Sequence, residues 1–514
     1  MRIVTCSQMK QAEQYAIENG VSALRLMENA GTAAARVIRE TVRPDGAAAL
    51  VICGRGNNGG DGFVVARKLH EAGFAACALL AAGDPHTPDA AEMLERLNGL
   101  PVTVVRGADA DRLQHLLGRA TLVVDALFGT GFRGRPSDEA AAVIGLINRA
   151  VQAKSMPVFS LDMPSGADAD SGEVPGACIA ADTTVAFGAA KTGQFTFPAA
   201  EYCGTVKAVN IGIPDAAFDD LLSPVELLEE HDVAAQLPRR SKDSNKGDYG
   251  RLLLLCGSSG MTGAAYMSAA AALRSGAGLV KLAVPSSVYP ILASKLNEAL
   301  VFPALETPEG SLALSNLDRF LALADASDAL LIGCGLSRDP ETVSLVRALV
   351  QHAACPVVLD ADGINAFEGH IDLLRASKAE LILTPHPGEM ARLCGKSIRA
   401  VQASRLRTAA EFAGDAKLTL ALKGAYTVVA SKTGRVWINP TGNPGMARGG
   451  SGDILAGMVA AFAAQGFTPE SAACCGVYLH GLAGDRCAQK FSQYGMLPTD
   501  LLTEIPQIFR GFSR

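Results

Sequence analysis

Residues 54–62 read GRGNNGGDG and directly follow the apolar run of residues 48–53. Five of the nine residues are glycine, and they include the pattern G-x-G-x-x-G, in which a glycine-rich turn brings the backbone close to a phosphate. The two asparagines and Asp61 add amide and carboxylate groups that a phosphate-only turn does not need. The stretch therefore predicts a loop at the end of a strand that holds a polar ligand, with room for a cation.

Short apolar runs alternate with longer helical patterns on both sides of this loop. Continuous apolar runs indicate strands buried on both faces, and their alternation with helices predicts right-handed βαβ units and a parallel sheet. The first-half strands are predicted at 48–53, 76–81, 102–105, 122–127, 158–162, 184–187 and 205–211, with helices that include 63–72 and 139–153. The second-half strands are predicted at 251–256, 279–284, 329–332, 357–360, 381–384, 418–422, 427–430 and 436–438.

The length of 514 residues is too great for one core and favours two domains. Residues 214–247 are polar, charged and proline-containing, and they separate the two α/β series. We expect a first domain at 1–215, a linker at 216–235 and a second domain at 236–514. No fixed repeat period relates the halves, so the two domains are expected to differ.

The overall composition excludes some classes of partner. With 46 basic and 52 acidic residues, 46 − 52 gives a formal net charge of −6, which provides no general attraction to nucleic acid or anionic membranes. The 12 cysteines form no C-x-x-C pair or zinc-spaced cluster, as is typical of buried thiols in a reducing compartment. The first residues carry no apolar signal segment, and the apolar stretch at 454–464 is too short to span a bilayer. We therefore expect a cytoplasmic protein that binds neither nucleic acid nor a membrane.

Four strand ends in the first half carry glycine together with Asn, Asp, Ser or Lys. They are GRGNNGGDG, FGTGFRG after Asp125, DMPSG at 162–166 and GAAKTG at 188–193. Ordinary turns share this composition, but four such turns in one domain favour a ligand site. Asn58, Asp125 and Ser165 offer oxygen ligands that suit a hard cation, and the single carboxylate favours a monovalent ion such as potassium. Asp162 is a candidate acid/base and Lys191 a weaker one, with an ordinary surface lysine as the alternative.

In this order the motifs N-G-G-D-G, D-A-L-F-G-T-G, D-x-P-S-G and F-G-x-x-K-x-G resemble the NAD(P)H-hydrate epimerase domain over about residues 1–215. The resemblance implies a Rossmann-like three-layer domain that interconverts the C6 epimers of hydrated NAD(P)H, with Asp162 at the reacting ring. Residues implied to bind the nucleotide are Asn57, Asn58, Gly59, Gly60, Asp61, Gly129, Thr130, Gly131, Phe132, Arg133, Gly134, Arg135 and Asp162. Those implied to hold potassium are Asn58, Asp125 and Ser165. The fold also resembles that of an mRNA-decapping scaffold protein, so a binding module remains an alternative.

The richest motif of the second half is NPTGNPGMARGGSGD at residues 439–453, which precedes an apolar helical run. Such a turn points several N–H groups and a helix N-terminus at one anionic group. Asp453 then lies beside a phosphate to be transferred, where it suits a base for an attacking hydroxyl, although a simple helix cap is the alternative. Further polar strand ends read KGAYT at 423–427, TPHPGE at 384–389 and GSSGMTGA at 257–264, and no Walker A sequence is present.

G-G-x-G-D, K-G-x-x-T and T-P-x-x-x-E together resemble the ribokinase-like superfamily, except that His386 stands where its kinases usually carry Asn. With N-K-G-D-Y-G at 245–250, the resemblance narrows to the ADP-dependent NAD(P)H-hydrate dehydratases over about residues 225–511. It implies a ribokinase-like α/β domain in which Glu389 organises magnesium and water. Residues implied to line the hydrated nucleotide are Ala264, Gly335, His386 and Asp453. Those implied to hold the adenine nucleotide are Lys423, Gly424, Ala425, Tyr426, Thr427 and Gly452.

Together the two resemblances predict a bifunctional enzyme that epimerises hydrated NADH and NADPH and dehydrates the S form with ADP, releasing AMP and phosphate. Potassium in the first site and magnesium with ADP in the second are the expected ions, and a homo-oligomer is expected. A ribokinase-type small-molecule kinase with a regulatory nucleotide-binding domain is the alternative function. His386 in place of Asn argues against that kinase.

Overall fold

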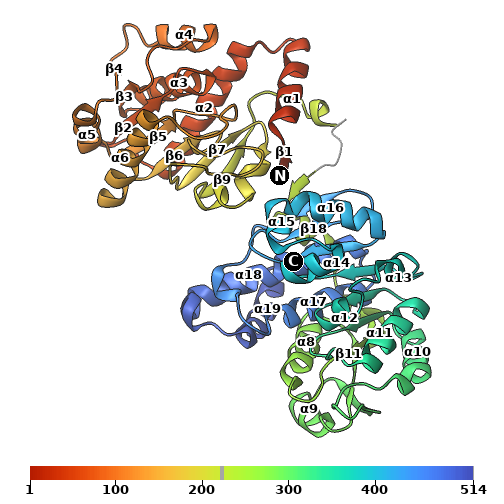
Figure 1. Cartoon of the computed structure of the whole chain (residues 1–514). Helices are drawn as coiled ribbons and strands as arrows, with labels where there is room; N and C mark the ends of the chain where they lie inside the picture. The colour runs from red at the N-terminus through yellow and green to blue at the C-terminus, as the bar shows by residue number, and fades with distance from the viewer. Residues whose placement is uncertain (220–224, 513–514) are drawn as a thin grey trace. The chain divides into compact units, whose positions relative to one another are not determined.

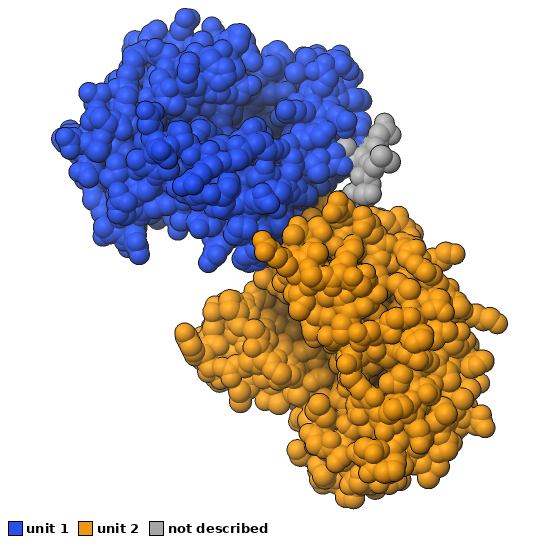
Figure 2. Space-filling view, viewed as in Figure 1, with its two compact units in different colours: residues 1–224 blue, residues 225–514 orange. Residues whose placement is uncertain are grey.

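The computed structural model describes residues 1–219 and 225–512, and the chain divides into two compact units. The first comprises Met1–Pro224 and the second Val225–Arg514, drawn in blue and orange in Figure 2. In each unit, strands that are mostly parallel form a sheet with helices on both sides (Figure 1). The α/β class predicted for both halves is confirmed.

The first unit is built on a parallel sheet with the strand order β4-β3-β2-β5-β6-β7-β9. Its strands are β2 (Ala48–Cys53), β3 (Ala75–Leu80), β4 (Thr103–Arg106), β5 (Leu122–Ala126), β6 (Val158–Leu161), β7 (Thr183–Phe187) and β9 (Thr205–Val209); β1 (Arg2–Val4) pairs with β8 (Ala190–Lys191). Counted from β2, the order is that of a Rossmann sheet with one more strand at its edge. The order reverses between β2 and β5, which is where such sheets bind ligands.

Helices cover both faces of this sheet. They are α1 (Cys6–Glu18), α2 (Ala23–Thr41), α3 (Asn57–Glu71), α4 (Pro88–Glu95), α5 (Ala110–Arg119) and α6 (Asp138–Lys154). Because side chains alternate along a strand, β2 contributes to two cores. Val51 packs in the core that contains α2 and α3, while Leu50 and Ile52 pack in the core that contains α5 and α6. The result is the three-layer arrangement predicted for this half.

The glycine-rich stretch after β2 is largely helical, which corrects the predicted loop and the predicted helix start at residue 63. Helix α3 begins at Asn57. A β-carbon on Gly59 would lie 2.0 Å from the Gly54 carbonyl oxygen, and one on Gly62 would lie 2.7 Å from the Ala126 side chain. These glycines therefore let the first turns of α3 lie directly against β2 and β5, and they do not serve as flexible loop residues.

This close approach predicts that Gly59→Ala destabilises the first unit. The added methyl group has to displace backbone, and overpacking of this kind costs about 1–3 kcal/mol. Gly118→Ala is the matched control, because Gly118 lies in α5 with no heavy atom within 4 Å of the added carbon. Chemical denaturation should show a lower free energy of unfolding for Gly59→Ala alone. Equal stability of the two variants would contradict the packing role.

The second unit has the strand order β13-β12-β11-β14-β15-β16-β17-β18-β19-β10. Its strands are β10 (Val225–Leu227), β11 (Arg251–Leu255), β12 (Leu279–Pro285), β13 (Leu300–Ala304), β14 (Ala329–Ile332), β15 (Val357–Leu359), β16 (Leu381–Leu383), β17 (Thr419–Leu422), β18 (Val428–Ala430) and β19 (Val436–Ile438). The order again reverses beside a central strand, between β11 and β14. Polar residues at the carboxyl ends of these strands therefore share one edge of the sheet.

The predicted all-parallel sheet is wrong at β18, which runs antiparallel to both β17 and β19. Residues 423–427 alone connect β17 to β18, and a parallel crossover needs about a dozen residues or more. The KGAYT segment is therefore a tight turn at the edge of the sheet. Tyr426 adopts a left-handed backbone conformation in it, with φ 52°.

Helices of the second unit form a layer on each side of its sheet. They are α7 (Glu230–Gln236), α8 (Thr262–Arg274), α9 (Tyr289–Lys295), α10 (Leu317–Asp325), α11 (Pro340–His352), α12 (Asp362–Asn365), α13 (Ile371–Arg375), α14 (Pro387–Cys394), α15 (Ile398–Ala403), α16 (Arg405–Ala416), α17 (Ser451–Ala464), α18 (Pro469–Gly495) and α19 (Pro498–Phe512). Helix α17 is almost wholly buried, and a β-carbon on Gly457 would lie 2.2 Å from a backbone oxygen of α8. The backbones of α8 and α17 are thus in close contact at Gly457.

The predicted linker at 216–235 lies partly outside the described residues. Within the described part, β10 pairs with β19, and Val233 of α7 is buried in the core of the second unit. Residues 225–235 therefore fold with the second unit. Strands β1, β8, β10 and β13 were not predicted from the sequence. No described helix has both the length and the apolar character needed to cross a membrane.

Candidate active sites

A cavity of about 760 Å³ opens at the carboxyl ends of β2 and β5 in the first unit. Its volume is in the range of small-molecule sites. Phe128 and Phe132 stack with ring centroids 4.9 Å apart and provide an apolar wall. The predicted nucleotide-binding residues that line it are Asn57, Asn58, Asp61, Gly129, Thr130, Gly131, Phe132 and Asp162. Residues that follow three separate strands, β2, β5 and β6, thus converge on one space.

The other predicted binding residues do not line this cavity. Gly59 and Gly60 are buried beneath it in α3. The Arg133 guanidinium forms ion pairs with Asp168 at 3.2 Å and with Asp170 at 2.7 Å, so its charge is directed at the loop that follows β6. Gly134 and Arg135 lie further along the same segment. A nucleotide role for these residues stays a prediction.

The three predicted potassium ligands lie close together beside the cavity, linked through the backbone of Phe128. Ser165 Oγ donates to Asp125 Oδ1 at 2.5 Å and accepts from Phe128 N at 2.8 Å. The Asn58 amide donates to the Phe128 carbonyl oxygen at 2.8 Å. Asp125 is 1 % exposed and accepts four hydrogen bonds, yet burial raises its pKa, an effect that the bonds from Ser165 and Ser160 only partly oppose.

The chemistry of this donor set fits a monovalent cation. Asp125 is a buried carboxylate with no ion-pair partner among the described residues. The Asp125 carboxylate and the Ser165 hydroxyl are bonded to each other, Ser165 and Asn58 both bond to the backbone of Phe128, and the oxygens of these groups are hard ligands. A bound cation of single charge would neutralise the carboxylate without the strict octahedral shell that magnesium requires.

Asp162 lies directly after β6 and is paired with a buried cation. The Lys191 Nζ contacts Asp162 Oδ1 and donates to the Phe187 carbonyl oxygen at 2.9 Å, and Lys191 is fully buried. The alternative of a surface lysine is therefore wrong. Asp162 has φ 61°, a conformation that few residues other than glycine adopt, and the Gln194 amide donates to its carbonyl oxygen at 2.7 Å. The backbone is thus held so that the carboxylate faces the cavity.

Two further carboxyl groups lie near this pair. Burial, then the charges of Asp162 and Glu13, raise the pKa of Asp61 well above its usual range. Burial and the Asp162 charge also raise the pKa of Glu13, which α1 brings to the cavity. No motif singled out Glu13, because it lies on an ordinary amphipathic helix. Three carboxyl groups and one ammonium therefore interact electrostatically at this site.

The second site is built at the N-terminus of α17. Gly450 caps the helix with φ 102°, so that Ser451, Gly452 and Asp453 form the first turn, as the motif predicted. Burial, then the charge of Asp360, raise the pKa of Asp453 to about 6. Burial lowers the pKa of His480 to about 4, and its Nε2 lies 3.3 Å from the Ser451 hydroxyl as a neutral partner. The first turn of α17 therefore places backbone N–H groups and the Asp453 carboxyl group at the same end of the helix.

Lys423 brings a positive charge to this helix N-terminus. Its Nζ pairs with Asp360 Oδ1 at 2.6 Å and lies 3.3 Å from the position of a β-carbon on Gly452. Burial disfavours the ammonium, but the charges of Asp360 and Glu389 outweigh it and raise the pKa of Lys423. The ammonium and the helix N-terminus together form a site that suits an anion. A β-carbon at residue 452 would reduce the space between the helix N-terminus and the Lys423 ammonium.

His386 caps a helix, a role that its sequence position did not suggest to us. Its Nδ1 accepts from Gly388 N at 2.9 Å, while Glu389 Oε2 accepts from His386 N at 2.8 Å, which makes a capping box. The side chain is 52 % exposed, so the alternative of a buried histidine is wrong. The buried Glu389 carboxyl has a raised pKa because of burial, and its oxygens fit a hard divalent ion such as magnesium.

The remaining predicted residues fall around the same edge. A β-carbon on Gly335 would lie 2.9 Å from the Ala264 β-carbon, so these two positions are in contact between β14 and α8. Thr427 donates from its hydroxyl to the Gly424 carbonyl oxygen at 2.9 Å and closes the turn that carries Ala425 and Tyr426. The backbone of that turn is thereby held in a fixed shape beside Lys423.

Asp360 is a further candidate site residue that the motifs missed. It is 2 % exposed and accepts from Lys423 and from the Thr384 hydroxyl at 2.7 Å. Polar atoms of Cys334, Asp360 and Asp453 all lie within 4.8 Å of one another. Its signal was present in the sequence, since residues 359–363 read LDADG at the end of a buried strand. The other sites were predicted because ligands bind at the carboxyl ends of parallel strands, and the same rule applies to this strand end.

Comparisons with known proteins agree with the division into two sites. Residues 252–507 match a family model described as NAD(P)H-hydrate dehydratase, and residues 23–193 match one described as YjeF-related protein N-terminus. The chain is 42 % identical to the bifunctional NAD(P)H-hydrate repair enzyme Nnr of Moorella thermoacetica, over 99 % of this chain and 97 % of that protein. It is 34 % identical to the Escherichia coli protein of the same name, over 95 % of this chain and 90 % of the relative.

Among solved structures, the second unit is similar to the ADP/ATP-dependent NAD(P)H-hydrate dehydratase of Bacillus subtilis, co-crystallized with ATP and magnesium. The identity is 32 %, the match covers 56 % of this chain and 99 % of that one, and the TM-score is 0.49.

Proposed function

Because this chain belongs to the family of bifunctional NAD(P)H-hydrate repair enzymes, we propose that each of its two sites carries one step of that repair. The first unit epimerises the R and S hydrates of NADH and NADPH, and the second dehydrates the S hydrate to NAD(P)H with ADP. The observation that carries this proposal is the full-length match to bifunctional relatives, on a chain with two chemically different sites. The alternative of a ribokinase-type small-molecule kinase is not favoured by these matches.

In the first unit, Asp162 is the proposed acid/base. Epimerisation at C6 of the hydrate requires proton transfer to and from the ring hydroxyl or the ring nitrogen, and Asp162 faces the cavity where that ring would lie. Lys191 supplies the second proton-carrying group through its direct contact with Asp162. The proposed nucleotide contacts are those predicted from the motifs, from Asn57 to Asp61 and from Gly129 to Arg135.

In the second unit, Asp453 is the proposed base for the C6 hydroxyl. The oxygen so activated attacks the terminal phosphoryl group of ADP and releases AMP. Loss of phosphate and of a ring proton then restores the ring double bond. In this proposal, Lys423 and the first-turn N–H groups of α17 bind the phosphoryl group and stabilise its developing negative charge, which their position beside Asp453 supports.

The positions of the other ligands are also proposals. Ala264, Gly335 and His386 line the hydrated ring, and the KGAYT turn with Gly452 holds the adenine nucleotide. Magnesium bound with ADP near Glu389 would neutralise phosphate charge. We further propose that the chain forms a homo-oligomer and works in the cytoplasm.

Dehydration should lose activity in acid with a pKa of about 6, because only the carboxylate form of Asp453 can accept a proton. The pKa lies above the usual value for aspartate, so the active form is present above pH 6 and is lost as the pH falls through that value. A pH profile of kcat/KM for the S hydrate measures it. An acid limb near the ordinary aspartate value, about 4, would contradict the assignment.

Potassium should stabilise the first unit through Asn58, Asp125 and Ser165. At 100 times its dissociation constant a ligand adds about 2.7 kcal/mol to the free energy of unfolding. Thermal unfolding in potassium chloride, compared with choline chloride at equal ionic strength, should show this gain in the wild type and not in Asp125→Asn. Equal stability in the two salts at all concentrations would rule out potassium at this position.

The proposed dehydration is tested by stoichiometry. Purified chain, S hydrate and ADP should yield NADH, AMP and phosphate in equal amounts. Consumption of ADP without recovery of reduced nicotinamide would reject the proposal.

A further inference from the structure

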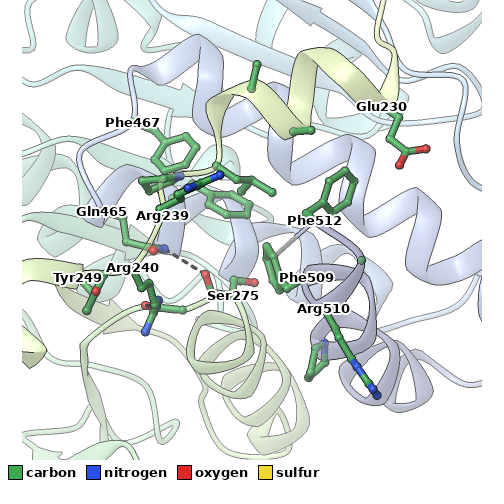
Figure 3. Close-up of a pocket in the computed structure, with 18 of the residues that line it drawn as sticks. Glu230, Arg239, Arg240, Tyr249, Ser275, Gln465, Phe467, Phe509, Arg510 and Phe512 are labelled. Carbon is green, nitrogen blue, oxygen red and sulfur yellow. Dashed lines mark hydrogen bonds between the residues drawn. The ribbon is translucent and has the colours of Figure 1, made fainter. Parts of the chain in front are cut away.

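A second and larger cavity, of about 1400 Å³, lies in the second unit. It is formed by α7, by the C-terminal ends of α8 and α17, and by α19 (Figure 3). None of the residues predicted to bind substrate or nucleotide lines it. The repair chemistry proposed above therefore gives no account of this space.

The cavity and the site of Asp453 lie at opposite ends of α17. Asp453 is in the first turn of the helix, whereas Phe462 and Gln465 reach the cavity from its last turn and C-cap. At 1.5 Å per residue, the 12 residues from Asp453 to Gln465 span about 18 Å. A ligand in this cavity is thus too far away to share the catalytic phosphate site.

Arginine side chains give the cavity a positive wall. Arg239, Arg240, Arg274 and Arg510 line it, and within the described residues none of the four forms an ion pair with a carboxylate. The Arg240 guanidinium lies 3.9 Å from the centre of the Tyr249 ring and donates to the Gly276 carbonyl oxygen at 2.5 Å, so it is held in place. Glu229 and Glu230 also line the cavity, with Glu230 beyond Phe512 and across from Arg239 in Figure 3. Cations therefore outnumber anions here.

Aromatic rings form another part of the cavity lining. The Phe462 ring lies 5.1 Å from Phe467 and 6.3 Å from Phe509, measured between centroids, and all three line the cavity. Phe467 stands beside Arg239 in Figure 3, with Phe509 on the other side. A planar ring bound here would contact both aromatic carbon and guanidinium groups, each of which stacks on such rings.

The hydroxyl of Ser275 is an independent observation that favours a polar ligand in the cavity. Ser275 lines the cavity and is 3 % exposed, yet its Oγ has no hydrogen-bond partner in the described structure. The neighbouring Gln465 amide donates instead to the backbone oxygens of Ser275 and Ala461, at 3.1 Å and 2.9 Å. A buried hydroxyl without a partner is costly, and a polar ligand would remove that cost.

From these observations we propose that this cavity binds a nucleoside monophosphate or a ligand of the same chemistry, with an aromatic base and a phosphate. The phosphate contacts Arg239 and Arg274, the base lies against the partly exposed rings of Phe467 and Phe509, and Ser275 donates to or accepts from the ligand. The site is separate from the proposed ADP site, and it does not depend on the repair activity.

Photolabelling tests the proposal with 8-azidoadenosine monophosphate on the full chain, followed by peptide mapping. The wild type should be labelled in the segments that contain Phe462–Phe467 or Phe509–Phe512. Arg239→Glu and Arg274→Glu should each reduce that labelling about tenfold at subsaturating probe, because each removes a charge-assisted contact. Arg39→Glu, an exposed residue on α2 of the first unit, is the matched control and should leave labelling unchanged.

Labelling of residues 423–427 in the same samples provides an internal reference. If that segment is labelled while the cavity segments are not, the second site is rejected and the proposed ADP site stands. If the cavity segments are labelled and residues 423–427 are not, the result contradicts the proposed ADP site and supports the second site. Displacement of the cavity label by inorganic phosphate as effectively as by AMP would reject a nucleotide site in favour of a simple anion site. Dehydration by both arginine variants should stay within about twofold of the wild type, which shows that they fold.

Discussion

Replacing Asp453 by asparagine is expected to slow dehydration of the S hydrate by about 10²–10⁴-fold, the usual contribution of a positioned general base. The amide keeps the size of the side chain but cannot accept the C6 hydroxyl proton. Lys423 and the helix N-terminus remain in place, so the KM for ADP should change little. Epimerisation by the first unit should be unaffected, and chromatographic separation of the two epimers measures it.

The stability of the same variant should change in the opposite direction. The pKa of Asp453 is about 6 in the folded chain and lies near 4 in an unfolded one, so the charged form is disfavoured by folding. Stability is therefore lost as the pH rises from about 4 to about 6, and a neutral amide avoids that loss. Asp453→Asn should gain up to about 3 kcal/mol at pH 7. Asp318→Asn, an exposed acid in the first turn of α10, is the control and should change neither activity nor stability by much.

The second large effect is expected at Asp162. Asp162→Asn should slow epimerisation by about 10²–10⁴-fold, because the amide cannot shuttle a proton at C6. With ADP in excess, the second unit should still consume the S hydrate and leave the R hydrate behind. Chromatography of the two epimers over time measures this. Asp45→Asn, an exposed position in the same unit, should convert both epimers as the wild type does.

Loss of stability offers another explanation for that result, and the ion pair provides a way to separate the two. Asp162→Asn leaves the buried Lys191 ammonium without its carboxylate, which costs about 3–5 kcal/mol. Adding Lys191→Met removes the buried charge and should recover much of that stability. The double variant should remain unable to epimerise. Recovery of epimerisation along with stability would show that Asp162 has a structural role only.

Much of the fold could be predicted, because the apolar runs that form β2, β5, β11 and β14 are continuous and end in polar residues. The strand ends then indicated where both sites lie. The antiparallel β18 was missed because the length of the connection, and not its composition, determines the strand direction. The early start of α3 was missed because its glycines act through close packing with partners that are distant in sequence.

Residue partnerships could not be read from the sequence. The motifs indicated Lys191 and Asp162 separately, but only the fold shows that the lysine is buried against the carboxylate. Glu13 approaches the same pair from α1, and Asp360 pairs with Lys423 across two strand ends. The partners are distant in sequence: Lys191 and Asp162 are 191 − 162 = 29 residues apart, and Asp162 and Glu13 are 162 − 13 = 149 residues apart. Local sequence patterns carry no information about such contacts.

The most direct test of two repair sites on one chain starts with a mixture of R and S hydrates of NADH. With excess ADP, the purified wild-type chain should convert the whole mixture to NADH, followed by the absorbance of the reduced nicotinamide. Asp162→Asn should stop at the S fraction, and Asp453→Asn should produce no NADH. If the wild type also stopped at the S fraction, or if no NADH formed while ADP phosphorylated a sugar or vitamin, the account would be contradicted.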